Sequence, residues 1–441
     1  MPALTSTFDP AVAGTLPGPE WLRARRLAAA ERLAGMELPT SEEEVWRYSL
    51  VDDLDLDSYT LPAAGGPRPV APEAALQAAR SAGEAAGCVV VVDGRVVHVE
   101  LAERWARRGV RIGPVADQPD GAELLGAVSG APGAASPDLF GVAHDACSVE
   151  PVAIVVPDGV VVDEPIVSVD WMSTEGALTF PHLVVRLGAD AEATVVDHRG
   201  GDDVAGLAVP VVELAVGPAA RLRYLDVQCR GPRSWQIATQ ASQVERDATL
   251  VAAQAALGGA YARTRADCRL VGRGATGNLM AVYYGDGDQT LDFRTFQDHA
   301  APDTTSNLLF KGAVAGHARS VYTGLIRVRP EGRGTNAFQT NRTIKLSEHA
   351  WAESVPNLEI ENNDVHCSHA SAVGPIDEDQ RFYLESRGVP TEVAERLIVE
   401  GFFREVLAQL PATEAADAVW SRIVERLDER LDERLDDRSA T

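Results

Sequence analysis

A degenerate repeat of short strands runs through the middle of this chain and constrains its fold more than any other feature. From about residue 152 to residue 355, alternating apolar and polar residues are interrupted by Gly, Asp and Pro, and each unit begins with a small residue. Periods of about 20 to 50 residues are typical of solenoids, in which each coil stacks on the previous one. The units start at Ala191, Ala220, Ala248, Ala275, Ala318 and Ala350, at spacings of 29, 28, 27, 43 and 32 residues.

The repeat predicts a mainly β fold with a parallel β-helix at its core. Stacked coils would bury inward aliphatic side chains in one continuous core and pair every strand with the coils above and below. The longest spacing predicts one enlarged coil between Ala275 and Ala318. The alternative to a β-helix is a β-sandwich with Greek-key connections, which also has strands about every 8 to 12 residues.

Helical and irregular segments precede the repeat. Near the N-terminus, apolar residues recur at three- and four-residue steps up to Met36 and predict a helix that Pro39 interrupts. A hydroxyl N-cap followed by carboxylates at residues 40–44 favours a second short helix, and both lie in an N-terminal helical region expected over residues 1–62. Residues 63–151 form a linker and a connection that contains a hairpin, because Asp93-Gly94 accepts the positive φ angles of a type I′ turn. The β-helix is then expected over residues 152–370.

A C-terminal helical region is expected over residues 371–441. Carboxylates from Asp377 to Asp379 favour a helix N-terminus, and a second helix, beginning at Thr391, carries a wide apolar stripe. The stripe either packs against the end of the solenoid or forms a docking surface for another subunit. The last run, over residues 423–438, repeats Arg-Leu-Asp-Glu and predicts a charged, solvated tail helix.

Charge and composition limit the partners of the chain. The 65 acidic and 40 basic residues give a formal charge of −25 at pH 7. This balance argues against nucleic acid as a partner, because phosphate binding needs a basic surface. Neither a signal-peptide pattern at the start nor an apolar stretch of membrane-spanning length is visible, so no membrane is expected and the cytoplasm is the default location.

Five cysteines are dispersed along the chain, and none forms a CxxC pair. An odd, scattered set argues against a disulfide framework and gives little support to a preassembled four-cysteine zinc or iron–sulfur site. Metal chemistry would therefore use scattered ligands or a second protein. The sequence also lacks the motifs of a phosphate-binding loop, a nucleophile elbow and a zinc-protease helix.

The densest group of potential ligands is the Asp-Val-His-Cys-Ser-His run at residues 364–369. In an extended strand, Cys367 and His369 share one face, whereas His366 and Ser368 share the other. Three interpretations stay open. In the first, the Cys367 thiol packs as a small hydrophobic group and the histidines form hydrogen bonds at the surface. In the second, the run holds a zinc ion with three ligands, and in the third, one exposed ligand completes a metal site together with a partner protein.

The remaining histidines stand alone among strand and turn residues and are expected to be structural. Asp292, Asp298 and Asp303 could form the carboxylate cluster of a β-helical carbohydrate lyase or hydrolase. Aromatic residues make up only 6% of the chain, however, which is sparse for a sugar-binding groove. The carboxylates are therefore interpreted as turn residues and part of a general acidic surface.

Several separated motifs resemble those of one known family. The motifs are Thr295 to His299, Ser306 to Gly312, Ser320 to Gly324, an expected turn at Gln339 to Arg342, and Asp364 to His369 followed by Asp377 to Gly388. Through them the chain resembles the SufB/SufD family of iron–sulfur cluster assembly scaffold proteins, densely over residues 291–403 and diffusely upstream, and its Cys-Ser-His sequence resembles the SufD branch.

The resemblance implies a right-handed parallel β-helix between helical ends, and a non-catalytic scaffold subunit of the SUF complex. The chain would pair with SufB through the β-helices and dock the SufC ATPase through its C-terminal helices. His369 is the implied metal ligand of a transient iron–sulfur cluster shared with SufB, and Cys367 is the second cofactor-binding candidate. The implied partner-binding residues are Phe382, Tyr383, Arg387, Phe402 and Phe403.

Two alternatives stay open within this resemblance. The chain could act as a SufB-like cluster acceptor, for which Cys268 and Cys367 are the candidate cysteines, and His366 could contribute to the cluster site. A flavin is a further cofactor that the complex could hold, although no residue of this sequence indicates one.

Overall fold

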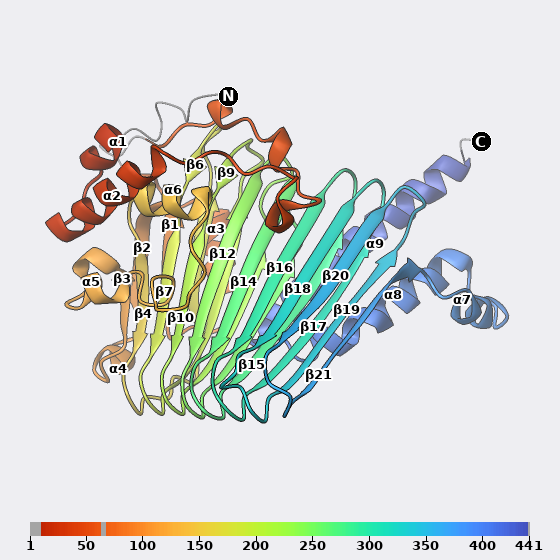
Figure 1. The fold of residues 1–441 in the computed structure, drawn as a ribbon. Coiled ribbons are helices and arrows are strands. Elements are labelled where there is room, and N and C mark those ends of the chain that lie inside the picture. The colour runs from red at the N-terminus through yellow and green to blue at the C-terminus, as the bar shows by residue number, and fades with distance from the viewer. Residues whose placement is uncertain (1–9, 63–67, 440–441) are drawn as a thin grey trace.

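The computed structural model describes residues 10–62 and 68–439, and a parallel β-helix built of two sheets dominates it (Figure 1). The first sheet has ten strands in the order β2-β1-β5-β8-β11-β13-β15-β17-β19-β21. Their bounds are β1 (Gly87–Val92), β2 (Arg95–Leu101), β5 (Ile166–Met172), β8 (Glu192–Gly201), β11 (Arg221–Gln228), β13 (Thr249–Ala256), β15 (Thr276–Gly285), β17 (Thr305–Val314), β19 (Asn336–Lys345) and β21 (His366–Pro375).

The second sheet has eleven strands, nine of them in the order β20-β18-β16-β14-β12-β10-β7-β4-β3, with β6 and β9 paired beside β12. From β10 to β21, successive strands of the chain alternate between the two sheets, so each of these coils contributes one strand to each sheet. Their bounds are β3 (Arg111–Pro114), β4 (Val152–Val156), β6 (Leu178–Thr179), β7 (His182–Leu187), β9 (Leu207–Ala208), β10 (Val211–Val216), β12 (Trp235–Val244), β14 (Tyr261–Leu270), β16 (Thr290–His299), β18 (Arg319–Val328) and β20 (Trp351–Ile360).

The stacked coils confirm the solenoid and exclude the sandwich, but the prediction of one enlarged coil is wrong. Ala275 precedes β15 in the ten-stranded sheet, whereas Ala318 precedes β18 in the other sheet, so the long spacing is one and a half coils. The position equivalent to Ala275 in the next coil is Thr304. This residue is buried and shares a hydrogen bond with His299 Nδ1 (2.8 Å), which is why the small-residue pattern skips it.

The N-terminal region, shown in red in Figure 1, packs together with α6 on the outer face of the eleven-stranded sheet, over the first residues of strands such as β12 and β14. The prediction of a second helix is wrong, because a single 3-10 turn, η2, stands there. The guanidinium of Arg263 lies 4.0 Å from the centroid of the Trp46 ring and donates to the Val45 carbonyl (2.6 Å), which ties this turn to β14. The elements are α1 (Pro10–Thr15), α2 (Glu20–Leu33), η2 (Glu44–Trp46), η3 (Val51–Asp53), η4 (Leu56–Ser58) and α6 (Leu139–Cys147).

The predicted hairpin is confirmed and belongs to the ten-stranded sheet. Asp93 and Gly94 have φ angles of 48° and 78°, and β2 pairs with β1 in antiparallel fashion while β5 pairs with β1 in parallel. Helix α3 packs on this part of the sheet through its alanines. The remaining short elements before the β-helix are α3 (Glu73–Arg80), α4 (Glu103–Ala106), η5 (Val115–Asp117) and α5 (Gly121–Leu124).

Three C-terminal helices follow β21: α7 (Glu378–Glu385), α8 (Thr391–Leu407) and α9 (Thr413–Ser439). Asp377 caps α7 by accepting from the backbone of Asp379 (2.9 Å), as the carboxylate run predicts. Helices α8 and α9 bury apolar residues against the outer face of the ten-stranded sheet and not against the end of the solenoid. The prediction of a solvated tail is wrong up to residue 429, because Leu427 is buried and Arg426 donates to the Leu257 carbonyl (2.6 Å).

Within the two described stretches, no helix combines the length and the apolarity that a membrane span requires.

Candidate functional site

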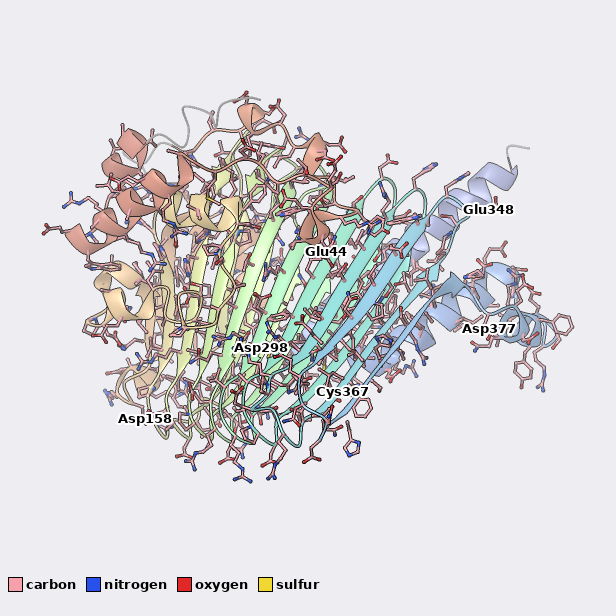
Figure 2. The ribbon with its side chains drawn as sticks, in the orientation of Figure 1. Glu44, Asp158, Asp298, Glu348, Cys367 and Asp377 are labelled. Atoms are coloured by element: carbon pink, nitrogen blue, oxygen red, sulfur yellow. The ribbon has the colours of Figure 1, made fainter. Side chains whose placement is uncertain are left out.

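The C-terminal end of the β-helix is open. Strands β20 and β21 are the terminal strands of their sheets, and most side chains of β21 are exposed. A terminal strand presents a row of backbone N–H and C=O groups along its outer edge, which is a template for pairing with another chain. Figure 2 shows Cys367 toward this end of the molecule, far from Asp158 at the other end.

The two sides of β21 carry different residues, as the sequence predicts. Cys367 and His369 lie opposite Ala337 and Gln339 of β19, which are both buried, so this row faces the interior of the β-helix. His366 lies on the other face of the strand. Cys367 packs against a small cluster of buried residues around Ala337, whereas the His369 side chain is exposed at the open end.

The protonation and burial of the thiols differ between the two candidate cysteines, Cys367 and Cys268. Burial raises the pKa of the Cys367 thiol, so it stays protonated at neutral pH unless a metal displaces the proton. Burial raises the pKa of Cys268 to about 12, and its side chain is enclosed in the core. Cys268 is therefore poorly placed to accept sulfur, which weakens the alternative of a SufB-like acceptor.

Beyond Cys367 and His369, further residues that face the interior from β19 and β21 are polar, and the sequence pattern did not predict them. The Ser371 and Ser354 hydroxyls lie 2.6 Å apart and join β21 to β20, and Asn341 donates to Ser354 (2.9 Å). Gln339 is buried, and its side-chain amide has no hydrogen-bond partner among the described residues. The expected turn at Gln339 to Arg342 is wrong, because these residues lie within β19.

The aspartates considered for sugar cleavage do not line an accessible cluster. Asp292 is buried between Arg263 and Arg294, and Asp298 is buried beside Arg329. Both lie within β16, so their interpretation as turn residues is wrong. Asp303 has a φ angle of 58° and does lie in a turn. Paired and enclosed carboxylates of this kind stabilise the coil and offer no surface to a polysaccharide.

Several of the isolated histidines are structural, as predicted. His299 contacts the hydroxyls of Thr304 and Ser306, and burial lowers the pKa of His299 to about 4. His144 and His182 are buried and their facing ring nitrogens lie 3.0 Å apart, while Glu213 accepts from His182 on its other side (2.9 Å).

A groove of about 1010 Å³ lies beside the open end, between the last residues of β19 and β21 and helices α7 and α8. Tyr383 and Leu397 line it, and both are exposed apolar side chains. Phe382 beside them is 70% exposed. Exposed apolar groups of this size in one patch are typical of an interaction site.

The other predicted partner-binding residues lie around the same helices. The Arg387 guanidinium stacks on the Tyr383 ring at 4.9 Å. Phe402 lines the groove and is half-buried, whereas Phe403 is fully buried against the ten-stranded sheet. Lys311 of β17 donates to the Phe402 carbonyl (2.9 Å) and so holds α8 on the sheet.

Comparison with known proteins identifies the family. Residues 171–402, more than half of the chain, match the model of the SufBD core domain of the SUF system for FeS cluster assembly. The chain belongs to the SufBD family. The match spans most coils of the β-helix, the open end, α7 and the part of α8 up to Phe402. The sequence prediction of a SUF-system iron–sulfur cluster assembly protein is confirmed at this level.

Individual relatives are also named as members of this family or as SufD, or carry another name. An iron–sulfur cluster assembly SufBD family protein of Mycobacterium tuberculosis is 38% identical over 258 residues, which are 56% of this chain and 64% of the relative. The iron–sulfur cluster assembly protein SufD of Escherichia coli is 30% identical over 238 residues, 54% of this chain and 56% of that protein. The chloroplastic protein ABCI7 of Arabidopsis thaliana is 28% identical over 341 residues, 74% of this chain and 71% of that protein. The chain thus spans under two thirds of the length of the mycobacterial relative.

Proposed function

We propose that this SufBD family member is a SufD-type, non-catalytic scaffold subunit of a cytoplasmic SUF complex. The observation that carries the proposal is the open end of the β-helix, where His369 lies in the inward row of β21, a terminal strand whose outer edge has no partner among the described residues. Similarity to the SufD of Escherichia coli supports the branch. A SufB-like paralogue would extend the two sheets beyond β20 and β21, which would satisfy their free backbone groups.

His369 is the proposed ligand of a transient iron–sulfur cluster shared with the SufB-like partner. A neutral imidazole ligates cluster iron in Rieske centres, so the ligand type has a precedent. Cys367 and His369 do not belong to any group of three donor side chains in the described parts of the chain, and this supports a site completed by a second protein. Cys367 is the second candidate, because its thiol must first lose a proton whose pKa burial raises.

The groove beside α7 and α8 is the proposed docking surface for the SufC ATPase. Phe382 and Tyr383 would supply the exposed aromatic contacts, with Arg387 holding the Tyr383 ring. Phe402 would contribute from the groove wall, and Phe403 would act by fixing α8 on the sheet. In this proposal the β-helix of residues 152–370 serves SufB, and the helices of residues 371–441 serve SufC.

The cluster role is tested by co-expressing the full chain with SufB-like and SufC-like partners. We expect the His369→Ala complex to assemble but to lose most of its iron and acid-labile sulfide. His366→Ala is the matched control, because His366 lies three residues away on the opposite face of β21. Normal cluster loading in the His369→Ala complex would remove the ligand role.

The docking role is tested separately by affinity capture of the ATPase. The double change Phe382→Asp and Tyr383→Asp should abolish capture while the SufB-like partner is retained, since it places two carboxylates in an apolar contact. Val70→Asp is the control, because Val70 is exposed and lies outside the C-terminal helices. Undiminished capture by the double variant would eliminate the groove as the docking surface.

A further inference from the structure

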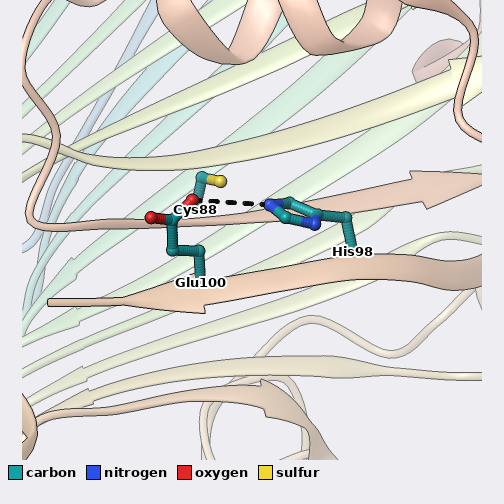
Figure 3. A group of neighbouring side chains, drawn as sticks. All are labelled: Cys88, His98 and Glu100. Carbon is teal, nitrogen blue, oxygen red and sulfur yellow. Dashed lines mark ion pairs between the residues drawn. The ribbon is translucent and has the colours of Figure 1, made fainter.

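Three side chains of types that commonly bind metals lie close together on the hairpin of β1 and β2. This hairpin forms the edge of the ten-stranded sheet opposite to the open end. Cys88 of β1 and Glu100 of β2 are paired directly across the two strands, so their side chains point to the same side of the sheet. His98 precedes Glu100 by two residues in the same strand and therefore shares that side. Figure 3 shows the three side chains converging.

The donor atoms are close to the arrangement that a metal requires. The thiol sulfur, an imidazole nitrogen and a carboxylate oxygen all lie within 4.8 Å of one another, and His98 Nε2 is 3.6 Å from Glu100 Oε2. Tetrahedral zinc with its usual bond lengths holds its donors about 3.5 Å apart. The His98 and Glu100 donors already have this spacing. The Glu100 side chain is largely exposed and can adjust toward the thiol.

We propose that Cys88, His98 and Glu100 bind one divalent transition-metal ion of the borderline class to which Zn²⁺ and Fe²⁺ belong. A mixed thiolate, imidazole and carboxylate set suits such ions and not Mg²⁺ or Ca²⁺, which prefer oxygen donors. Three protein ligands leave the fourth position to water. Binding breaks the S–H bond of Cys88 and releases that proton to solvent, and no electron is transferred.

The surroundings of the thiol support a cation. Burial and the neighbouring Glu100 carboxylate both raise the pKa of Cys88, so the thiolate and the carboxylate repel each other when no cation lies between them. A divalent ion between the two groups turns this repulsion into attraction. The sheet fixes the backbone of Cys88, because β1 is paired on both sides, with β2 and with β5.

The site is independent of the proposed cluster site. Strand β1 is separated from β21 by seven strands in the order of the ten-stranded sheet. With a spacing of about 4.8 Å between neighbouring strands, the two sites lie roughly 40 Å apart. A metal on the hairpin would therefore link β1 to β2 and would not depend on the SufB-like partner.

The proposal is tested by titrating the purified, metal-free full chain with Co²⁺. We expect one equivalent to bind with a thiolate-to-cobalt charge-transfer band, to release one proton per metal, and to be displaced by Zn²⁺. The Cys88→Ser variant should lose the band. His98→Gln and Glu100→Gln should weaken binding by about tenfold or more, since loss of even an outer-shell partner costs that much.

Two controls keep the outcome unambiguous. Cys367→Ser and His366→Gln should retain the band, because these residues lie on β21. Zn²⁺ should raise the Tm of the parent chain and of Cys367→Ser but not that of Cys88→Ser. A band that persists in Cys88→Ser, a band lost in Cys367→Ser, or no stoichiometric binding would overturn the proposal. None of these results bears on the proposed cluster role of His369, which is tested separately by the iron and sulfide content of the assembled complex.

Discussion

His369 on β21 lies directly opposite Gln339 on β19, and the buried side-chain amide of Gln339 has no hydrogen-bond partner among the described residues. An unpartnered buried amide costs free energy, and such groups recur beside functional sites. A histidine that binds metal through one ring nitrogen commonly donates from the other to a nearby acceptor, which fixes the tautomer. Gln339 is the inward-facing residue that lies in register with His369 on the neighbouring strand, and its amide oxygen could accept such a bond.

The first prediction follows from this pairing. Gln339→Leu in the assembled complex should lower the affinity for cluster iron by about tenfold, the usual effect of removing a group that orients a ligand. Iron and sulfide per complex give the measurement, and circular dichroism checks the fold. Asn336→Ala on the outward face of β19 is the control. Equal losses in both variants would mean that Gln339 has only a structural role.

Some parts of this site could be predicted from sequence because they depend on local alternation alone. The two faces of residues 366–369 follow from the period of an extended strand. The polar row of Gln339, Asn341 and Ser371 could not be predicted, since Gln and Asn in a short run are also typical of turns. Their inward direction is set by pairing with neighbouring coils, which lie about 30 residues away in the chain.

The fold shows the same division. The hairpin was predictable because Asp93-Gly94 takes positive φ angles that few other residue pairs accept. The coil boundary at Thr304 was not, because a buried hydroxyl that bonds His299 occupies the place of a small apolar residue. The charges of the last run, residues 423–438, likewise predict a solvated helix. Ile423 and Leu427 are buried because α9 lies on the sheet, and this contact is not visible in local sequence.

The second prediction concerns the attachment of α8. Lys311 is buried and donates to the Phe402 carbonyl, and it forms an ion pair with Glu405. Lys311→Met should lower the local opening free energy of α8 by about 2 kcal/mol, the typical value of a charge-assisted hydrogen bond. Amide hydrogen exchange in residues 391–407 should then be roughly thirtyfold faster. Lys345→Met is the matched control, and unchanged exchange in Lys311→Met would contradict this attachment.

The third prediction is a pH dependence of stability. Burial lowers the pKa of His299 to about 4, against an ordinary value of 6.5 in the unfolded chain. Below pH 6.5 the unfolded state therefore binds a proton that the folded state does not, so the free energy of unfolding falls as the pH is lowered through this window. The loss from His299 alone should be about 2 kcal/mol between pH 7 and pH 5.

Urea denaturation at the two pH values measures this contribution. The His299→Gln variant should be less stable at pH 7, because the bonds to Thr304 and Ser306 are altered, but its stability should change less with pH. His366→Gln is the control, since His366 is exposed on β21. An unchanged pH dependence in His299→Gln would show that other groups account for it.

The last prediction addresses the open end as an interface. Leu358 of β20 lies opposite the buried Ile326 of β18, so it faces the interior of the coil, yet it is 37% exposed because no described strand covers it. A SufB-like coil stacked on β20 would bury this side chain. Leu358→Arg should therefore weaken association with that partner by about tenfold or more, since an unpaired buried charge costs several kcal/mol. Val161→Arg, which changes an equally exposed side chain, should associate normally, and equal weakening in both variants would place the interface elsewhere.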